Sequence, residues 1–149
     1  MKAGDKVDDF ELPRDGGGTL KLSDELAKGP VVLFFYPKAM TPGCTKESCH
    51  FRDLKGEFEE VGAQRIGISA DNVDRQEQFS QKHGFDFPLV SDSNRAVARQ
   101  FGVKRAGPLF NKRMTFVIDT DGKVLEAIGS EMNMDVHADR ALEVLKARS

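Results

Sequence analysis

Hydrophobic residues in this chain follow several spacings, and each spacing predicts a kind of element. Residues 31–36 form an unbroken apolar run, which is typical of a central strand covered on both faces. Residues 10–12 and 20–22 alternate between apolar and polar side chains across a glycine-rich turn, and so predict a hairpin. Further strands are expected at residues 65–69, 87–91, 115–119 and 124–128, the last two joined through an Asp-Gly turn.

Apolar residues that return every three or four positions predict the helices. Ser23 is a candidate N-cap for a short helix. One helix is expected from Thr41 to Val61, with Gly62 ending it. Two more helices are expected at residues 72–83 and 95–101, and a last one carries Ala138, Ala141, Leu142 and Leu145 on one face.

Strands and helices therefore alternate, and an antiparallel hairpin comes late in the chain. This order predicts an α/β protein with a thioredoxin-like fold, in which a mixed central β-sheet carries helices on both faces. The chain has 149 residues and neither a repeat nor a linker, so we expect a single domain over residues 1–149.

Charge and composition argue against several classes of protein. The 22 Lys and Arg against 24 Asp and Glu give a net charge of −2, so no strong field favours nucleic acid or an anionic membrane. No apolar run is long enough to cross a membrane, and the N-terminus lacks the apolar stretch of a signal peptide. We therefore expect a cytoplasmic protein, where two cysteines indicate reactivity rather than a structural disulfide.

Both cysteines, Cys44 and Cys49, lie just after the predicted central strand. Thr41 is a good N-cap and Pro42 a favoured first helical residue, so we expect the Thr41 hydroxyl beside the Cys44 amide. Only a few per cent of a free thiol is ionised at neutral pH, and a helix N-terminus supplies at most about 2 kcal/mol toward the thiolate. A reactive thiolate here therefore needs a cation, for which Lys38, Lys46, Arg52 and Arg113 are the candidates.

The spacing of the two cysteines limits how they can react. Five helical residues rise about 7.5 Å and turn about 140°. The Cα atoms of Cys44 and Cys49 would then lie roughly 8.5–9 Å apart, beyond the 7 Å or so that a disulfide tolerates. Either the two sulfurs never bond, or the first helical turns unwind.

The motif Pro37-x-x-x-Thr41-x-x-Cys44 matches the active-site pattern of the peroxiredoxins. A second cysteine five residues later, as at Cys49, resembles the peroxiredoxin Q group, also called bacterioferritin comigratory protein. Three other segments are similar to that group as well: residues 4–13, residues 35–38, and Arg113 together with the strand that follows it.

The resemblance implies a thiol peroxidase that uses neither metal nor organic cofactor. Cys44 would reduce hydrogen peroxide or an organic hydroperoxide and become a sulfenic acid. Cys49 would resolve this into an intramolecular disulfide, which a thioredoxin-like protein would reduce. The group is often monomeric, so we expect a monomer, although a dimer stays open.

The remaining site residues take their roles from the same resemblance. Thr41, the Cys44 amide and Arg113 would hold the peroxide and stabilise the leaving oxygen. Pro37 would shield the thiol from water. Glu47 would orient the arginine, unless it is only a solvated carboxylate of the first turn.

Two other functions stay open on the sequence. A thiol–disulfide oxidoreductase usually spaces its cysteines by two residues, and this chain spaces them by four. A redox sensor would use the same cysteines without turnover. The chain departs from the group at Ala39-Met40, where a polar residue is common, and residues 104–112 look irregular. The three histidines are scattered along the chain and do not indicate a metal site.

Overall fold

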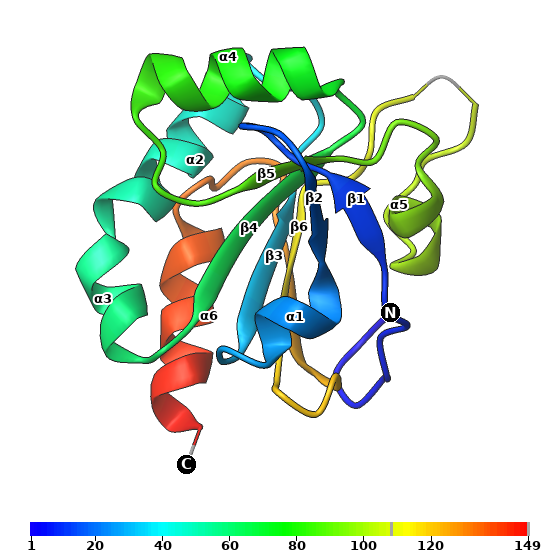
Figure 1. Cartoon of the computed structure of the whole chain (residues 1–149). Helices are drawn as coiled ribbons and strands as arrows, with labels where there is room; N and C mark the ends of the chain where they lie inside the picture. Colours follow the sequence, from blue (N-terminus) through cyan, green and yellow to red (C-terminus); the bar gives the residue numbers. More distant parts are fainter. Residues whose placement is uncertain (108, 149) are drawn as a thin grey trace.

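A computed structural model describes residues 1–107 and 109–148 (Figure 1). Its centre is a sheet of five strands in the order β5-β4-β3-β6-β7. The strands β3, β4 and β5 run parallel, whereas β3–β6 and β6–β7 are antiparallel, so the sheet is mixed as the sequence predicts. The central strands are β3 (Val31–Phe35), β4 (Gln64–Ser69), β5 (Leu89–Ser91), β6 (Met114–Ile118) and β7 (Val124–Gly129).

A separate two-stranded hairpin and six helices surround this sheet in the described part of the chain. The hairpin joins β1 (Glu11–Pro13) to β2 (Thr19–Lys21), as the alternating pattern predicts. The helices are α1 (Leu22–Leu26), α2 (Pro42–Asp53), α3 (Lys55–Glu60), α4 (Val73–His83), α5 (Ala96–Gln100) and α6 (Val136–Ala147). No helix among the described residues has the length and apolarity that a membrane crossing requires.

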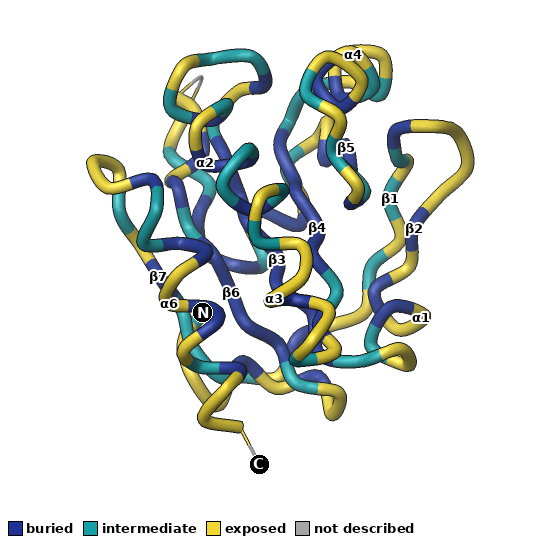
Figure 2. Tube along the Cα trace, turned by 90° about the vertical axis from the view of Figure 1, so that its left-hand side faces the viewer, coloured by how far each residue is buried: buried dark blue, intermediate teal, exposed yellow. Residues whose placement is uncertain are grey.

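Strand β3 is buried along its whole length because both faces of the sheet are covered (Figure 2). Val32 and Phe34 belong to a core that the helices α2, α3, α4 and α6 complete. Val31, Leu33 and Phe35 alternate with them and pack into a second core, under the hairpin, α1 and α5. The predicted arrangement of helices on both faces is confirmed.

Two helix boundaries differ from the sequence prediction. The expected single helix from Thr41 breaks at Leu54, whose φ of −93° and ψ of 20° leave the helical region. Arg65 Nη1 donates to the Phe51 carbonyl at 2.7 Å, so a side chain takes the acceptor that the next helical turn would use. Ser23 is not an N-cap, because α1 begins one residue earlier and Asp9 accepts hydrogen bonds from the Ser23 amide and hydroxyl.

Helix α4 ends as its sequence predicts. The Asn72 side chain accepts from the Arg75 amide at 2.8 Å, and Gly84 closes the helix at a φ of 63°, a conformation that favours glycine. The irregular segment 104–112 is tied to Arg95, whose guanidinium donates to the carbonyls of Arg105 and Leu109. Pro108, within that segment, lies outside the described residues.

The core around β3 generates a stability prediction. Phe34 is fully buried and stacks on Phe51 with ring centroids 4.1 Å apart. We expect Phe34→Ala to lower the free energy of unfolding by about 3–5 kcal/mol, because it leaves a cavity in the core. Phe110→Ala is the matched control: Phe110 is 56% exposed, so the change should stay within about 0.5 kcal/mol. Urea denaturation measures both, and equal losses would contradict the packing described above.

Candidate active site

The site is built where the chain leaves β3 and enters α2. The Ala39 amide donates to Asp71 Oδ2 at 2.7 Å, which fixes the middle of this loop. Met40 then has a φ of 68°, an uncommon conformation for a residue with a side chain. The turn brings the chain into α2 at Pro42, with Thr41 at the N-cap position and Cys44 in the first helical turn, as the sequence predicts.

The expected role of the Thr41 hydroxyl as a cap is wrong. The Thr41 side chain makes no hydrogen bond to an amide of α2. Its hydroxyl instead donates to the Lys38 carbonyl at 2.8 Å, across the loop. The amides of the first turn therefore keep their free donors near Cys44.

Cys44 is fully buried, and its sulfur accepts a hydrogen bond from Arg113 Nη2 at 3.3 Å. The sheet register explains this contact. Strand β6 runs antiparallel to β3 and pairs Met114 with Phe35, so the residue before Met114 lies at the end of β3 from which the cysteine loop departs. Of the four candidate cations, Arg113 is the one that reaches the sulfur.

The other three candidate cations lie elsewhere. Arg52 pairs with Asp53 and donates to the His83 carbonyl at 2.7 Å. Lys38 lies over the ring of Phe110, 5.9 Å from its centroid, and Lys46 is exposed.

Glu47 is the second acid that contacts the guanidinium. Arg113 Nη1 donates to Glu47 Oε1 at 2.7 Å, and Glu47 is fully buried. It follows Cys44 by three residues in α2, so both acids lie on one face of the helix. The interpretation of Glu47 as a solvated carboxylate is therefore wrong.

Two acids thus share one buried cation. Burial raises the pKa of Glu47 to about 8, although the charge and the hydrogen bond of Arg113 oppose this rise. Burial lowers the pKa of Arg113, but Glu47 and Cys44 raise it by more, so the guanidinium stays charged.

Three residues that the sequence analysis did not assign to the site also belong to it: Thr115, Glu131 and His137. His137 Nδ1 lies 3.5 Å from Glu47 Oε2 and 2.8 Å from the Thr115 hydroxyl. Glu131 accepts a hydrogen bond from the Arg113 amide at 3.1 Å. One signal pointed to His137: it precedes Ala141 by four residues and so falls on the apolar stripe of the last helix, where a histidine is unexpected.

Cys49 lies on the same unbroken helix as Cys44, and both thiols are free. It is partly buried, and this burial raises the pKa of the Cys49 thiol, with Arg52 opposing and Asp53 adding to the rise. In this conformation Cys49 is therefore a protonated thiol at neutral pH. Pro37, from the motif, is half-buried in the loop after β3.

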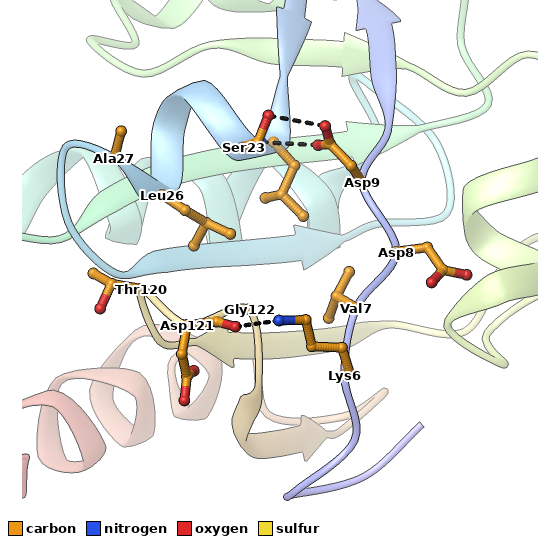
Figure 3. A pocket seen from close by; sticks show the side chains of 11 residues that line it. Lys6, Val7, Asp8, Asp9, Ser23, Leu26, Ala27, Thr120, Asp121 and Gly122 are labelled. Carbon is orange, nitrogen blue, oxygen red and sulfur yellow. Dashed lines mark hydrogen bonds between the residues drawn. The ribbon is translucent and has the colours of Figure 1, made fainter.

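A surface pocket lies at the end of the sheet opposite to the cysteines (Figure 3). Its volume is about 510 Å³, and Lys6, Leu26 and Asp121 are among the side chains that line it. The pocket adjoins the end of β6 at Ile118, and Ile118 pairs with Val31 at the start of β3. Cys44 lies beyond the other end of β3. The pocket therefore has no part in the chemistry of the cysteines.

Several known proteins are similar to this chain in both sequence and fold. The model of the AhpC/TSA family matches residues 3–127. A Mycobacterium tuberculosis protein named as a peroxiredoxin is 61% identical over 150 residues, which cover 99% of this chain and 97% of that protein. The crystal structure of peroxidoxin BcpB from M. tuberculosis has a TM-score of 0.97 at 58% identity and covers 100% of this chain and 99% of its own.

A structure of the bacterioferritin comigratory protein of Xanthomonas campestris is also similar. Its TM-score is 0.85 at 38% identity, with coverage of 93% of this chain and 90% of that one. That protein is described as having alkyl peroxide reduction activity, and the structure belongs to a set of trapped intermediate and ligand complexes.

Gly43 offers a test of the contact between Arg113 and Cys44. A Cβ atom at Gly43 would lie 3.2 Å from Arg113 Nη2 and 3.4 Å from Met134 Sδ, which crowds the guanidinium. We expect Gly43→Ala to lower the thiolate fraction of Cys44 about twofold at neutral pH, because the guanidinium must move away by a few tenths of an ångström to make room. Ultraviolet thiolate absorbance in a Cys49→Ser background measures this fraction.

The matched control is Gly56→Ala in α3, where nothing lies within 4 Å of the added atom. It should leave the thiolate unchanged and stabilise the helix by up to about 1 kcal/mol. An unchanged thiolate in Gly43→Ala would show that the guanidinium position does not control the sulfur.

Proposed function

Because the chain belongs to the AhpC/TSA family and, within it, to the peroxiredoxin Q group, it is a thiol peroxidase, and we propose that Cys44 is the sulfur that attacks the peroxide. The observation that carries this assignment is the hydrogen bond from Arg113 to Cys44 Sγ at 3.3 Å, at the first turn of α2. A buried cation and free helix amides both favour the thiolate, which is the nucleophilic form. Family membership also favours this function over a disulfide oxidoreductase or a sensor.

In the first step, the thiolate attacks one peroxide oxygen and the O–O bond breaks. The sulfur gains that oxygen as a sulfenic acid, and the leaving oxygen departs with the bonding electron pair and takes up a proton to become water or an alcohol. The donors that would hold the two oxygens are Arg113 and the Cys44 amide. The Thr41 hydroxyl, which donates to the Lys38 carbonyl, would accept a hydrogen bond from the peroxide. Arg113 Nε is buried without a hydrogen-bond partner in the described chain, which leaves the guanidinium one further donor.

In the second step, Cys49 attacks the sulfenic acid, so that an S–S bond forms and water leaves. The intact helix keeps the two sulfurs apart, so the first turns of α2 must unwind. The sequence around Cys44 supports this, because Gly43, Thr45 and Ser48 are poor to middling helix formers. The Ser48 hydroxyl is also buried without a partner among the described residues.

The far end of α2 is held in place. Phe51 stacks between Phe34 and Phe58, with ring centroids 4.1 Å and 5.7 Å away. The Phe51 carbonyl accepts from Arg65, whose guanidinium also pairs with Asp86. The unwinding therefore affects the part of α2 before Phe51 and leaves the packing of Phe51 against Phe34 and Phe58 intact.

A dithiol protein of the thioredoxin type would complete the cycle, reducing the disulfide to two thiols while its own thiols become a disulfide. Such a reductant requires a reducing compartment, so the proposal includes a cytoplasmic location. Both cysteines belong to one chain, and the cycle therefore works in a monomer.

We include organic hydroperoxides among the substrates, because the similar X. campestris protein is described as reducing alkyl peroxides. Pro37, Leu109 and Phe110 contribute to a pocket of about 200 Å³ beside the cysteine loop. Leu109 and Phe110 are more than half exposed, which gives an alkyl group an apolar surface near the site.

Two variants separate the roles of the cysteines. Cys44→Ser should abolish peroxide consumption, because no nucleophile remains. Cys49→Ser should consume about one equivalent of peroxide per chain and then stop, since the sulfenic acid is not resolved. A peroxide assay coupled to a thioredoxin system measures turnover, and full steady-state turnover in Cys49→Ser would reject Cys49 as the resolving residue.

Oxidation should also change the helix. After one equivalent of peroxide, mass spectrometry should find a loss of two hydrogens in the peptide that holds both cysteines. Far-ultraviolet circular dichroism of the same sample should show a loss of helical signal, because the first turns of α2 unwind. A disulfide formed with the helical signal unchanged would contradict the unwinding step.

A further inference from the structure

The charges in the site raise a problem that Arg113 alone does not solve. Its guanidinium is the cation for both the Cys44 sulfur and the Glu47 carboxylate. If both acids are ionised, two negative charges share one positive charge in a buried place, which costs free energy. The carboxylate then competes with the thiolate for the same cation.

His137 is fully buried and faces Glu47 Oε2, the carboxylate oxygen that Arg113 does not bind. Its Nε2 lies 2.9 Å from the Ser130 carbonyl oxygen, which only accepts, so Nε2 carries a hydrogen and donates it. In the neutral ring, Nδ1 is therefore an acceptor, for which the Thr115 hydroxyl is the donor at 2.8 Å. Glu47 Oε2 then faces Nδ1 at 3.5 Å and has no hydrogen-bond partner among the described residues.

A single proton between these two groups resolves the conflict. Placed on Nδ1, it makes an imidazolium next to the Glu47 carboxylate, and Thr115 accepts the hydrogen bond instead. Placed on Glu47 Oε2, it makes a neutral acid that points toward a neutral ring. In both cases the pair carries no net charge, and the charge of Arg113 is balanced by the Cys44 thiolate alone.

We propose that His137 is a positioning residue that holds one proton jointly with Glu47, so that Arg113 stays available to the Cys44 sulfur. This inference rests on the proposed role of Cys44 and adds a residue to its site. Glu47 still orients the guanidinium through Oε1, as an acceptor, without needing a full negative charge.

No other charged group around Glu47 and His137, among the described residues, takes over the role of the shared proton. Arg113 faces the pair from the residue before β6, and Glu131 faces it from the loop before α6. Arg113 opposes a charge on His137, and Glu131 favours one. Asp139, on the same helix as His137, is bound to His50 at 2.7 Å. Burial raises the pKa of Glu47 and lowers the pKa of His137, so both groups resist carrying a lone charge.

The test is a double-mutant cycle of His137→Gln and Glu47→Gln. Glutamine keeps a donor near the position of Nε2 for Ser130 but removes the acceptor at Nδ1. The readouts are the single-turnover rate with hydrogen peroxide and the ultraviolet thiolate signal, both in a Cys49→Ser background. We expect His137→Gln to lower both about tenfold at a pH above the Glu47 pKa of about 8 when Glu47 is present, and less than about twofold when residue 47 is glutamine.

The pH dependence gives an independent readout. At low pH, Glu47 is protonated with or without the histidine, so the loss in His137→Gln should be small. As the pH rises, Glu47 without its partner loses its proton at a lower pH, so the reduction of the rate and of the thiolate signal in His137→Gln should grow. His137→Asn, which keeps an oxygen acceptor near the position of Nδ1, should recover part of the rate.

Two results would overturn the inference. An equal loss in both backgrounds would show that His137 only supports the fold, and a loss independent of pH would show the same. The thiolate signal does not depend on peroxide chemistry. If Cys44→Ser still turned over peroxide, the proposed function would fail while the coupling between Glu47 and His137 could still be measured.

Discussion

The site depends on one guanidinium that is buried between two acids. Arg113 donates to the Cys44 sulfur through one terminal nitrogen and to Glu47 through the other. The planar fork of arginine makes this double contact possible, whereas a lysine would offer one point of charge. Because the group is buried, its charge acts with little screening by solvent, and the sulfur and the carboxylate compete for it.

The sheet puts this cation in place. Arg113 and Cys44 are 69 positions apart in the chain, yet the antiparallel pairing of β6 with β3 brings the residue before Met114 to the end of β3. A shift of the pairing by one residue would move alternate side chains to the other face of the sheet. The buried phenylalanines on both faces of β3 oppose such a shift, so the core also positions the site.

In the proposed cycle, helix α2 has to meet two opposite demands. Its intact first turn presents Cys44 to Arg113, whereas disulfide formation with Cys49 requires that turn to open. The division of the helix at Leu54 and the anchoring of Phe51 by Arg65 confine the change to the N-terminal part. Local opening of this kind is least costly where few apolar contacts are lost, and in α2 the large buried apolar side chain, Phe51, lies beyond Cys49.

The sequence by itself determined the class of fold, most of the elements and the place of Cys44 in the first turn of a helix, because these depend on local spacing: an apolar run for β3, Asn72 and Gly84 for the ends of α4, and Thr41-Pro42 before the cysteine. It also proposed Arg113, through the resemblance of its strand. Only the tertiary structure decided which of four cations reaches the sulfur, how the Thr41 hydroxyl points, where the helix after Cys49 breaks, and that His137 stands behind Glu47. Those outcomes are contacts between residues far apart in the chain, and side-chain packing and strand register set such contacts, not the order of residues in any one segment.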